Sequence, residues 1–277
     1  MKVVNPLIER CLQLISLMAE EPRAFRLGEI SEALDLPKSA THRLLSALCN
    51  MGWAEQDSET GFYRLTLRLA IMGQRFLLAT RIPDLTRPVL ERLAHDSEEL
   101  VRLAIVEGER LSWVNFVQGR QSGLVYQPAM IGRVPLHVTA NGKAWLSTLP
   151  PDDAVRIVLE DGFGSPERFG PNALRSVEAL RAALDLTRAR GWGESQEEAE
   201  AGIAAIAAPI CPGGPGTPAV ATCSVAGPLM RFGPAGIERS ARLVMAAAAE
   251  LAAIWPIRGG GQSSEAANRG EPARKAV

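Results

Sequence analysis

The chain contains few of the residues from which metal centres and disulfide frameworks are built. Only four cysteines and three histidines occur among its 277 residues, and no two cysteines stand at the spacing of a zinc-ligand pair. No run of 18 apolar residues is present, and the amino terminus lacks the basic and then apolar pattern of a signal peptide. These absences argue against a metal site, a disulfide scaffold and a membrane-bound protein, and they predict a cytoplasmic protein.

An excess of positive charge is also missing. The net charge is −1 and the pI is about 6.4, whereas domains that bind nucleic acid are often strongly basic. Residues 1–80 alone carry equal numbers of acidic and basic side chains. Any basic surface must therefore be local, and binding to DNA of arbitrary sequence should be weak. The composition, with 47% hydrophobic and 22% charged residues, is that of a globular protein long enough for two domains.

A helix with a polar outer face is predicted to begin at Pro37. Proline suits the first helical turn because the N–H that it lacks would have no partner there, and Gly52 provides the end of the helix. Apolar residues at spacings of three and four form the predicted buried stripe, which comprises Ala40, Leu44, Ala47, Leu48 and Met51. The opposite side carries Ser39, His42, Arg43 and Ser46.

The flanking segments complete the pattern of a winged helix-turn-helix. A helix after Pro6 is predicted to bury Ile8, Leu12, Ile15 and Met18, and a shorter helix from Leu27 breaks at Asp35 before a three- to four-residue turn. Residues 53–56 and 62–65 are typical of two strands joined by a turn. Short polar side chains reach base edges and cations meet phosphates. The predicted DNA contacts are Arg26, Lys38, Ser39, Thr41, His42, Arg43 and Arg64.

Three segments resemble the IclR family of bacterial transcriptional regulators. They are residues 36–48 with Gly52-Trp53, residues 131–144, and the spaced set Gly191, Ser195, Glu198, Ala205, Ile206, Ala207 and Ile210. The resemblance extends from residue 5 to about residue 256, with Cys211-Pro212 as a clear departure. It implies an α+β protein of two domains: an N-terminal winged helix-turn-helix over 1–65, a linker helix over 66–80 and a GAF-like effector-binding domain with an antiparallel sheet over 81–256. Residues 257–277 are predicted to be a disordered tail.

Within the second domain, strands are predicted at 100–107, 110–116, 123–127, 203–210 and 219–225. Helices are predicted at 85–95, 140–147, 152–159, 176–189 and 235–254. Since strands and helices do not alternate strictly, an antiparallel sheet with helices packed on it is expected.

The resemblance also implies an effector pocket, made by Ala140, Asn141, Ser195, Ala205, Ser224 and Ala226. Free N–H groups at the helix start near Ala140 favour a carboxylate. Alanine replaces more polar family residues at 205 and 226, so we expect an effector with more apolar or aromatic surface than a small oxoacid. Arg102 is expected to be an outward surface arginine, with a role as a charge partner of the effector as the alternative.

No arrangement of residues typical of an enzyme is recognisable. We therefore predict a homo-oligomeric regulator, dimer or tetramer, that binds operator DNA and a small organic acid, uses no cofactor and catalyses no reaction. The apolar residues of 66–80 exceed what a solvated linker needs and indicate packing on a partner. Two other interpretations stay open: an enzyme built on the second domain with the first as a docking unit, and a winged module that binds protein.

Overall fold

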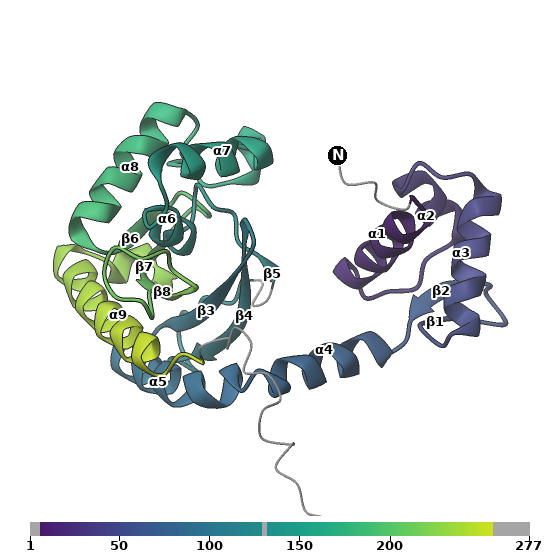
Figure 1. Ribbon diagram of the computed structural model, residues 1–277, viewed down its shortest axis with the longest axis horizontal. Helices are drawn as coiled ribbons and strands as arrows, with labels where there is room; N and C mark the ends of the chain where they lie inside the picture. Colours follow the sequence, from purple (N-terminus) through teal and green to yellow (C-terminus); the bar gives the residue numbers. More distant parts are fainter. Residues whose placement is uncertain (1–5, 129–131, 257–277) are drawn as a thin grey trace, which may run out of the picture. The chain divides into compact units, whose positions relative to one another are not determined.

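The chain divides into two compact units, Met1–Thr80 and Arg81–Val277 (Figure 1). The computed structural model describes residues 6–128 and 132–256, so the predicted tail lies outside the described residues. Within these ranges no helix has both the length and the apolar character needed to cross a membrane.

The first unit contains three helices followed by a hairpin of two strands, in the predicted order. These elements are α1 (Pro6–Glu20), α2 (Leu27–Ala33), α3 (Lys38–Asn50), β1 (Ala54–Gln56) and β2 (Tyr63–Leu65). The two strands pair antiparallel, and Phe25 and Tyr63 exchange two backbone hydrogen bonds of 2.8 Å that extend the hairpin. Leu14, Ile30 and Leu45 form the fully buried centre of this unit. The winged helix-turn-helix prediction is thereby confirmed.

The buried stripe of α1 differs from the prediction. Leu14 and Met18 are buried, whereas Ile8 and Leu12 are 57% and 59% exposed. Apolar residues surround most of this helix, so spacing alone permits more than one stripe. The stripe that contains Leu14 faces the core of this unit. The other apolar side of α1 is therefore left exposed.

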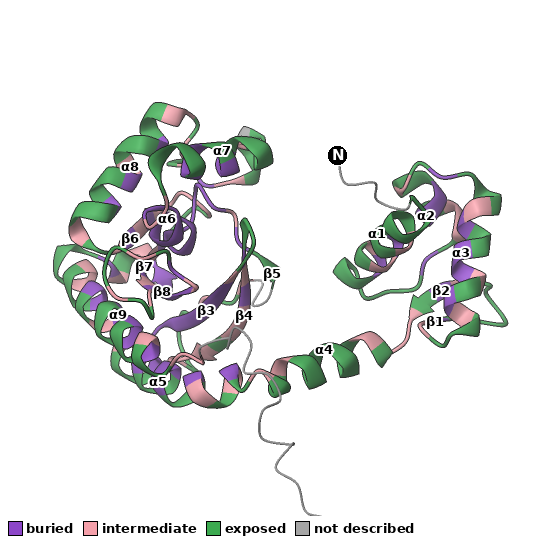
Figure 2. Ribbon diagram, in the orientation of Figure 1, coloured by how far each residue is buried: buried purple, intermediate pink, exposed green. Residues whose placement is uncertain are grey.

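Helix α4 (Arg68–Ala79) is the last element of the first unit and starts two residues later than predicted. It has no buried residue, which Figure 2 shows as a helix without any purple segment. Leu67, just before it, is 77% exposed, and Phe76 within it is 66% exposed. Apolar side chains on α4 therefore remain uncovered by the described residues of this chain.

The second unit is built on a six-stranded antiparallel sheet with the order β5-β4-β3-β8-β7-β6. Its strands are β3 (Leu100–Glu107), β4 (Arg110–Gln118), β5 (Gly132–Arg133), β6 (Gly193–Gln196), β7 (Ile203–Ile210) and β8 (Ala221–Pro228). The expected antiparallel sheet is confirmed, but β5 and β6 were not predicted. The prediction of a strand at 123–127 is wrong: Gln118 and Arg231 side chains hold the carbonyl oxygens of Tyr126 and Leu124, each at 3.1 Å.

Helices cover both faces of this sheet (Figure 1). They are α5 (Ile82–Ser97) and α9 (Pro234–Ile254) on one face, with α6 (Ala140–Leu146), α7 (Pro151–Asp161) and α8 (Val177–Arg190) on the other side. Helix α5 starts three residues earlier than predicted because Pro83 lies in its first turn, where proline is tolerated.

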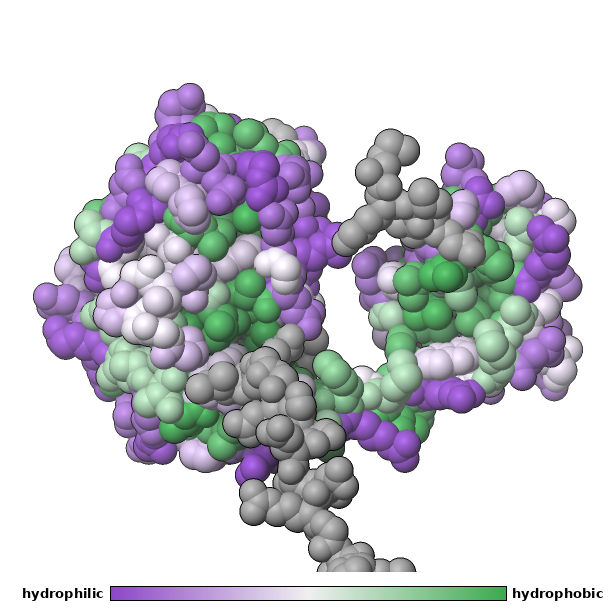
Figure 3. All heavy atoms as spheres, viewed as in Figure 1, coloured by the Kyte–Doolittle hydropathy of each residue, from purple (hydrophilic) through white to green (hydrophobic). Residues whose placement is uncertain are grey.

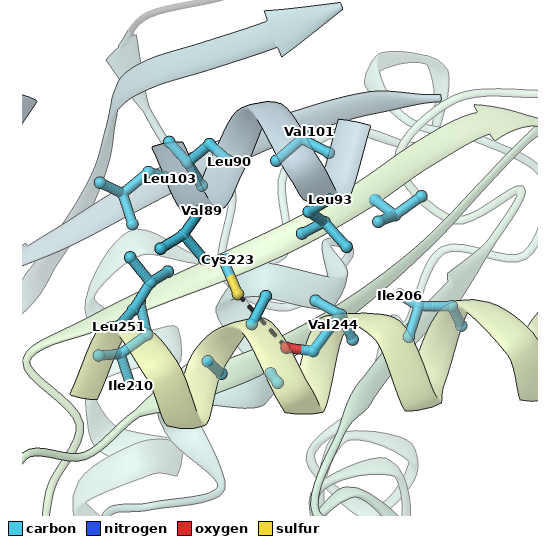
Figure 4. Close-up of a cluster of buried hydrophobic side chains, with 14 of the residues drawn as sticks. Val89, Leu90, Leu93, Val101, Leu103, Ile206, Ile210, Cys223, Val244 and Leu251 are labelled. Atoms are coloured by element: carbon cyan, nitrogen blue, oxygen red, sulfur yellow. Dashed lines mark hydrogen bonds between the residues drawn. The ribbon is translucent and has the colours of Figure 1, made fainter. Parts of the chain in front are cut away.

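Cys223 of β8 lies at the centre of the core between the sheet and helices α5 and α9 (Figure 4). Its thiol donates to the carbonyl oxygen of Val244 across a sulfur–oxygen distance of 3.6 Å. Complete burial raises the pKa of this thiol to about 12. The residue therefore acts as a small apolar side chain of the core and not as a reactive thiol.

Candidate DNA-binding and effector sites

Helix α3 presents four exposed polar side chains on its outer face. Lys38, Ser39, His42 and Arg43 are all exposed, and Pro37 precedes the helix as its N-terminal cap residue. Within residues 6–128 and 132–256, none of the four makes an ion pair or a side-chain hydrogen bond. This face is therefore free to meet hydrogen-bonding groups from outside the chain.

Thr41 does not belong to this face, so its predicted contact with DNA is corrected. The residue is completely buried, and its hydroxyl donates to the carbonyl oxygen of Pro37 at 3.3 Å. Such a bond to the preceding turn lets threonine bury its methyl group without an unsatisfied polar atom. The buried stripe accordingly runs through Thr41, Leu44, Leu45 and Leu48, while the predicted Ala47 and Met51 are exposed.

The two wing-side arginines have local partners. Arg64 of β2 forms an exposed ion pair with Glu55, which lies opposite it on β1. The guanidinium carbon of Arg26 lies 5.1 Å from the centre of the Phe62 ring. Both side chains are exposed, but the charge of Arg64 is partly offset by its neighbour. The unpaired positive charge of this unit therefore lies on α3 more than on the wing.

The predicted effector residues are brought together around the inner face of the sheet. Ser195 of β6 lies opposite Ala205 of β7, and Ala205 lies opposite Ala226 of β8. One row further along, Ser224 lies opposite Ala207. Ala207 packs in turn against Ala140 at the start of α6. Residues that are 86 positions apart in the sequence thus line one apolar surface.

Most polar groups among them already have partners within the chain. The Asn141 side chain donates to the Thr222 hydroxyl at 2.9 Å and accepts from the Trp113 indole at 3.5 Å. The Ser195 hydroxyl donates to the carbonyl oxygen of Val138 at 2.7 Å. Asn141 and Ser195 therefore hold α6 and the segment before it to the sheet.

The start of α6 is less suited to an anion than expected. The hydroxyl of Thr139 accepts a hydrogen bond of 3.0 Å from the Gly142 N–H and so caps the helix. The helix has only seven residues, so its dipole is small. The start of α6 is therefore expected to bind a carboxylate more weakly than the sequence indicated.

Two polar side chains on the same face have a buried atom without a hydrogen-bond partner among the described residues. The hydroxyl oxygen of Ser224 and the Nε of Arg102 are both buried and make no hydrogen bond within the described residues. Arg102 is 5% exposed and lies opposite Ser224 on the neighbouring strand β3. The expectation that Arg102 is an outward surface residue is therefore wrong.

The sequence and the structure match known protein families over nearly the whole described chain. The IclR helix-turn-helix domain matches residues 7–58, and the family described as bacterial transcriptional regulator IclR C-terminal matches residues 74–253. The chain belongs to the IclR family.

Individual IclR relatives agree with this assignment. The HTH-type transcriptional regulator XynR of Escherichia coli is 32% identical over 200 residues, which cover 71% of this chain and 76% of XynR. An IclR transcriptional regulator from Alicyclobacillus acidocaldarius superposes with a TM-score of 0.77 at 19% identity, over 90% of this chain and 98% of that one. An IclR homologue from Microbacterium hydrocarbonoxydans, solved with 4-hydroxybenzoate, superposes with a TM-score of 0.69 at 23% identity, over 88% of this chain and 98% of that one. The two structures establish the likeness of fold.

The IclR-family chain also contains a buried ion pair that sequence analysis did not identify. Lys143 of α6 contacts both carboxylate oxygens of Glu198, at 2.6 and 2.7 Å, and the two side chains are 5% and 12% exposed. Burial lowers the pKa of Lys143, while the charge of Glu198 opposes that shift. Both residues stood in the segments that resemble the family, but they are 55 positions apart in the sequence, which gave no sign of their pairing. The ion pair ties α6 to the loop after β6.

In the described ranges, no group of three or more histidine, cysteine, aspartate or glutamate side chains is placed to hold a metal ion.

Proposed function

We propose that this IclR-family protein binds operator DNA through the first unit and that a small organic acid, bound by the second unit, changes its affinity for that DNA. The observation that carries the proposal is the outer face of α3, where four polar side chains are exposed and without a partner in the described residues. In an ordinary solvated helix such side chains commonly pair with neighbours three or four positions away.

The residues of α3 divide by chemistry. Ser39 and His42 carry short hydrogen-bonding groups that suit base edges, whereas Lys38 and Arg43 suit phosphate oxygens. Arg26 and Arg64 would add phosphate contacts from the wing side. The buried Thr41 supports the geometry of the helix instead of contacting DNA.

A homo-oligomer is part of the proposal. Figure 3 shows a hydrophobic surface over α1, where Ile8 and Leu12 are more than half exposed, and α4 exposes Ile71 and Phe76. Apolar patches of this kind mark interaction surfaces in water-exposed proteins. A dimer would present two copies of α3 to two half-sites of an operator and double the small basic surface.

The effector is proposed to occupy the sheet face lined by Ala140, Ala205, Ser224 and Ala226. Three of these residues have no polar side chain, which favours an acid with an apolar or aromatic body. The homologue solved with 4-hydroxybenzoate supports the same class of ligand. The acid would alter DNA affinity only if it bound one arrangement of the protein better than another.

The test is fluorescence anisotropy of the full chain with the DNA upstream of its own coding region, compared with shuffled DNA over a series of salt concentrations. We expect preference for the native fragment, lost by about 10- to 100-fold in a Ser39→Ala, His42→Ala double variant, because each base contact contributes about 1–3 kcal/mol. His95→Ala, an exposed histidine of α5, is the matched control. Equal affinity for native and shuffled DNA, at this and neighbouring promoters, would contradict the proposal and favour the enzyme or protein-docking interpretation.

A further inference from the structure

The second unit buries a positive charge for which the described residues provide no counterion. Arg102 is 5% exposed, and within residues 6–128 and 132–256 no carboxylate lies within 4.0 Å of its guanidinium. Its Nε has no hydrogen-bond partner. Other buried charges of this unit are paired, as Lys143 is with Glu198 and Glu99 is with Arg231. Arg102 is therefore an exception that requires an explanation, because an uncompensated buried charge is costly.

The surroundings hold the guanidinium in place without neutralising it. Its central carbon lies 3.9 Å from the centre of the Trp113 ring, a cation–π contact that orients the group but carries no net negative charge. Burial lowers the pKa of Arg102, and the negative charge of Glu200 only partly opposes that shift; an oxygen of Glu200 accepts a 3.0 Å hydrogen bond from the Tyr126 hydroxyl. A water molecule could accept a hydrogen bond from Nε, but it would leave the charge uncompensated.

The position of Arg102 on the sheet connects it to the proposed effector site. On β3 it lies directly opposite Ser224 of β8, whose buried hydroxyl is also without a partner. Ser224 in turn lies opposite Ala207, which belongs to the alanine surface between the sheet and α6. Two unused hydrogen-bonding groups, one of them charged, thus adjoin a surface that has no polar side chain.

We propose that Arg102 and Ser224 bind the carboxylate of the effector, so that the ligand is an aromatic monocarboxylic acid whose ring lies against the alanine surface and Trp113. This inference rests on the proposed effector site and moves the carboxylate from the start of α6 to the pair of central strands. An arginine fork matches the geometry of a carboxylate, and the ligand supplies the missing negative charge. A neutral analogue of the same shape would leave the guanidinium unpaired.

The experiment measures ligand binding to the full chain by isothermal titration and by thermal shift. The probes are benzoate, phenylacetate and 4-hydroxybenzoate, each compared with its uncharged amide. We expect at least one acid to bind and its amide to bind at least about 10-fold more weakly. Arg102→Met should weaken the binding of that acid by about 10- to 100-fold, the range for the loss of a hydrogen bond to a charged group. Arg102→Lys should recover part of the affinity, and Ser224→Ala should weaken it less.

The stability of the ligand-free protein separates a binding role from a structural one. If Arg102 serves a ligand, the ligand-free Arg102→Met protein should unfold at the same temperature as the parent or a few degrees higher, because a buried unpaired charge has been removed. If Arg102 serves the fold, the same change should lower the unfolding temperature. Arg92→Met on α5, which removes an exposed ion pair with Glu250, is the control and should alter neither readout.

Three results would overturn the inference: no acid of the panel binds, the amides bind as well as the acids, or Arg102→Met binds the acid with parental affinity. Should Arg102→Met fail to fold, the structural role is established and the inference is again overturned. Operator binding by ligand-free Arg102→Lys and Arg102→Met, measured by anisotropy, tests the regulator function separately. If operator binding is retained while one of the three ligand-binding results above is found, only the assignment of the carboxylate site is rejected, and the DNA-binding proposal is unaffected.

Discussion

Two short helices of this chain are opposites in their relation to the core. All seven residues of α6 are buried, whereas none of the twelve residues of α4 is (Figure 2). Both sequences are rich in apolar side chains, so composition does not separate them. Helix α6 is surrounded by β6, β7, β8 and α8 of its own unit, while α4 has apolar side chains that the described chain leaves in solvent. Packing within its own unit therefore stabilises α6, whereas no packing within the described chain buries a residue of α4.

The largest expected effect comes from breaking the charge pair that holds α6. Lys143→Met leaves the carboxylate of Glu198 buried without its partner, so we expect a loss of about 3–5 kcal/mol of unfolding free energy in a urea titration. Arg87→Met, which breaks the exposed pair with Glu91 on α5, should cost less than about 1 kcal/mol. Similar losses of unfolding free energy in the two variants would show that burial adds nothing to the contribution of the Lys143–Glu198 ion pair.

The second prediction compares one glycine in each helix. An added Cβ at Gly142 of α6 would overlap the backbone of Leu136, so Gly142→Ala should destabilise by about 3 kcal/mol. At Gly73 of α4 an added Cβ meets no atom within 4 Å, and Gly73→Ala should stabilise by about 0.5–1 kcal/mol through helix propensity. Thermal unfolding of both variants decides the matter. A loss of stability at Gly73 would indicate a close contact with another molecule at that point.

The third prediction concerns the exposed apolar side of α4. If a second copy covers it, Ile71→Ser with Phe76→Ser should weaken the interface by about 2–4 kcal/mol, because about half of each side chain is exposed and could be buried there. Analytical ultracentrifugation should then show dissociation to monomers, with far-UV circular dichroism unchanged. Leu159→Ser, at an exposed apolar position of α7, is the control and should leave the oligomer intact. An unchanged oligomer in the double variant would exclude α4 from the interface.

The smallest effect is a pH dependence near α6. His137, in the segment before this helix, is 4% exposed, and burial lowers its pKa below the usual 6.5. Since the folded state disfavours the charged imidazole, the stability contributed by the neutral form is present above about pH 6.5 and is lost as pH falls below it. Urea titrations between pH 5 and 8 should show this slope in the parent protein and a smaller one in His137→Gln.

Much of the fold could be predicted because it depends on local patterns. The bounds of β3 and β7 agree with the predicted 100–107 and 203–210, since continuous apolar runs ended by turn residues mark strands buried on both faces. Where proline or glycine stood at the boundary, helix ends agreed within about two residues, except at the start of α5, which lies three residues earlier than predicted. Strand β6 escaped prediction because four residues containing glycine, glutamate, serine and glutamine carry little strand signal by themselves.

The candidate sites were predictable only in part, for the same physical reason. A polar residue in an apolar stretch has no local signal that says which way it faces. Thr41 was expected outside and is buried, because its hydroxyl could bond to the preceding turn. Arg102 was expected outside and is buried, because β3 lies in the middle of the sheet with helices over both faces.

The family, the order of the elements and the polar face of α3 could be read from the sequence alone, since they follow from short-range spacing along one helix or strand. The pairing of Lys143 with Glu198 could not, nor could the position of Arg102 beside Ser224 with no counterion among the described residues. Such pairings depend on strand order and on which face each helix covers. Those are set by burying apolar surface across the whole unit, and no stretch of sequence near either residue records the result.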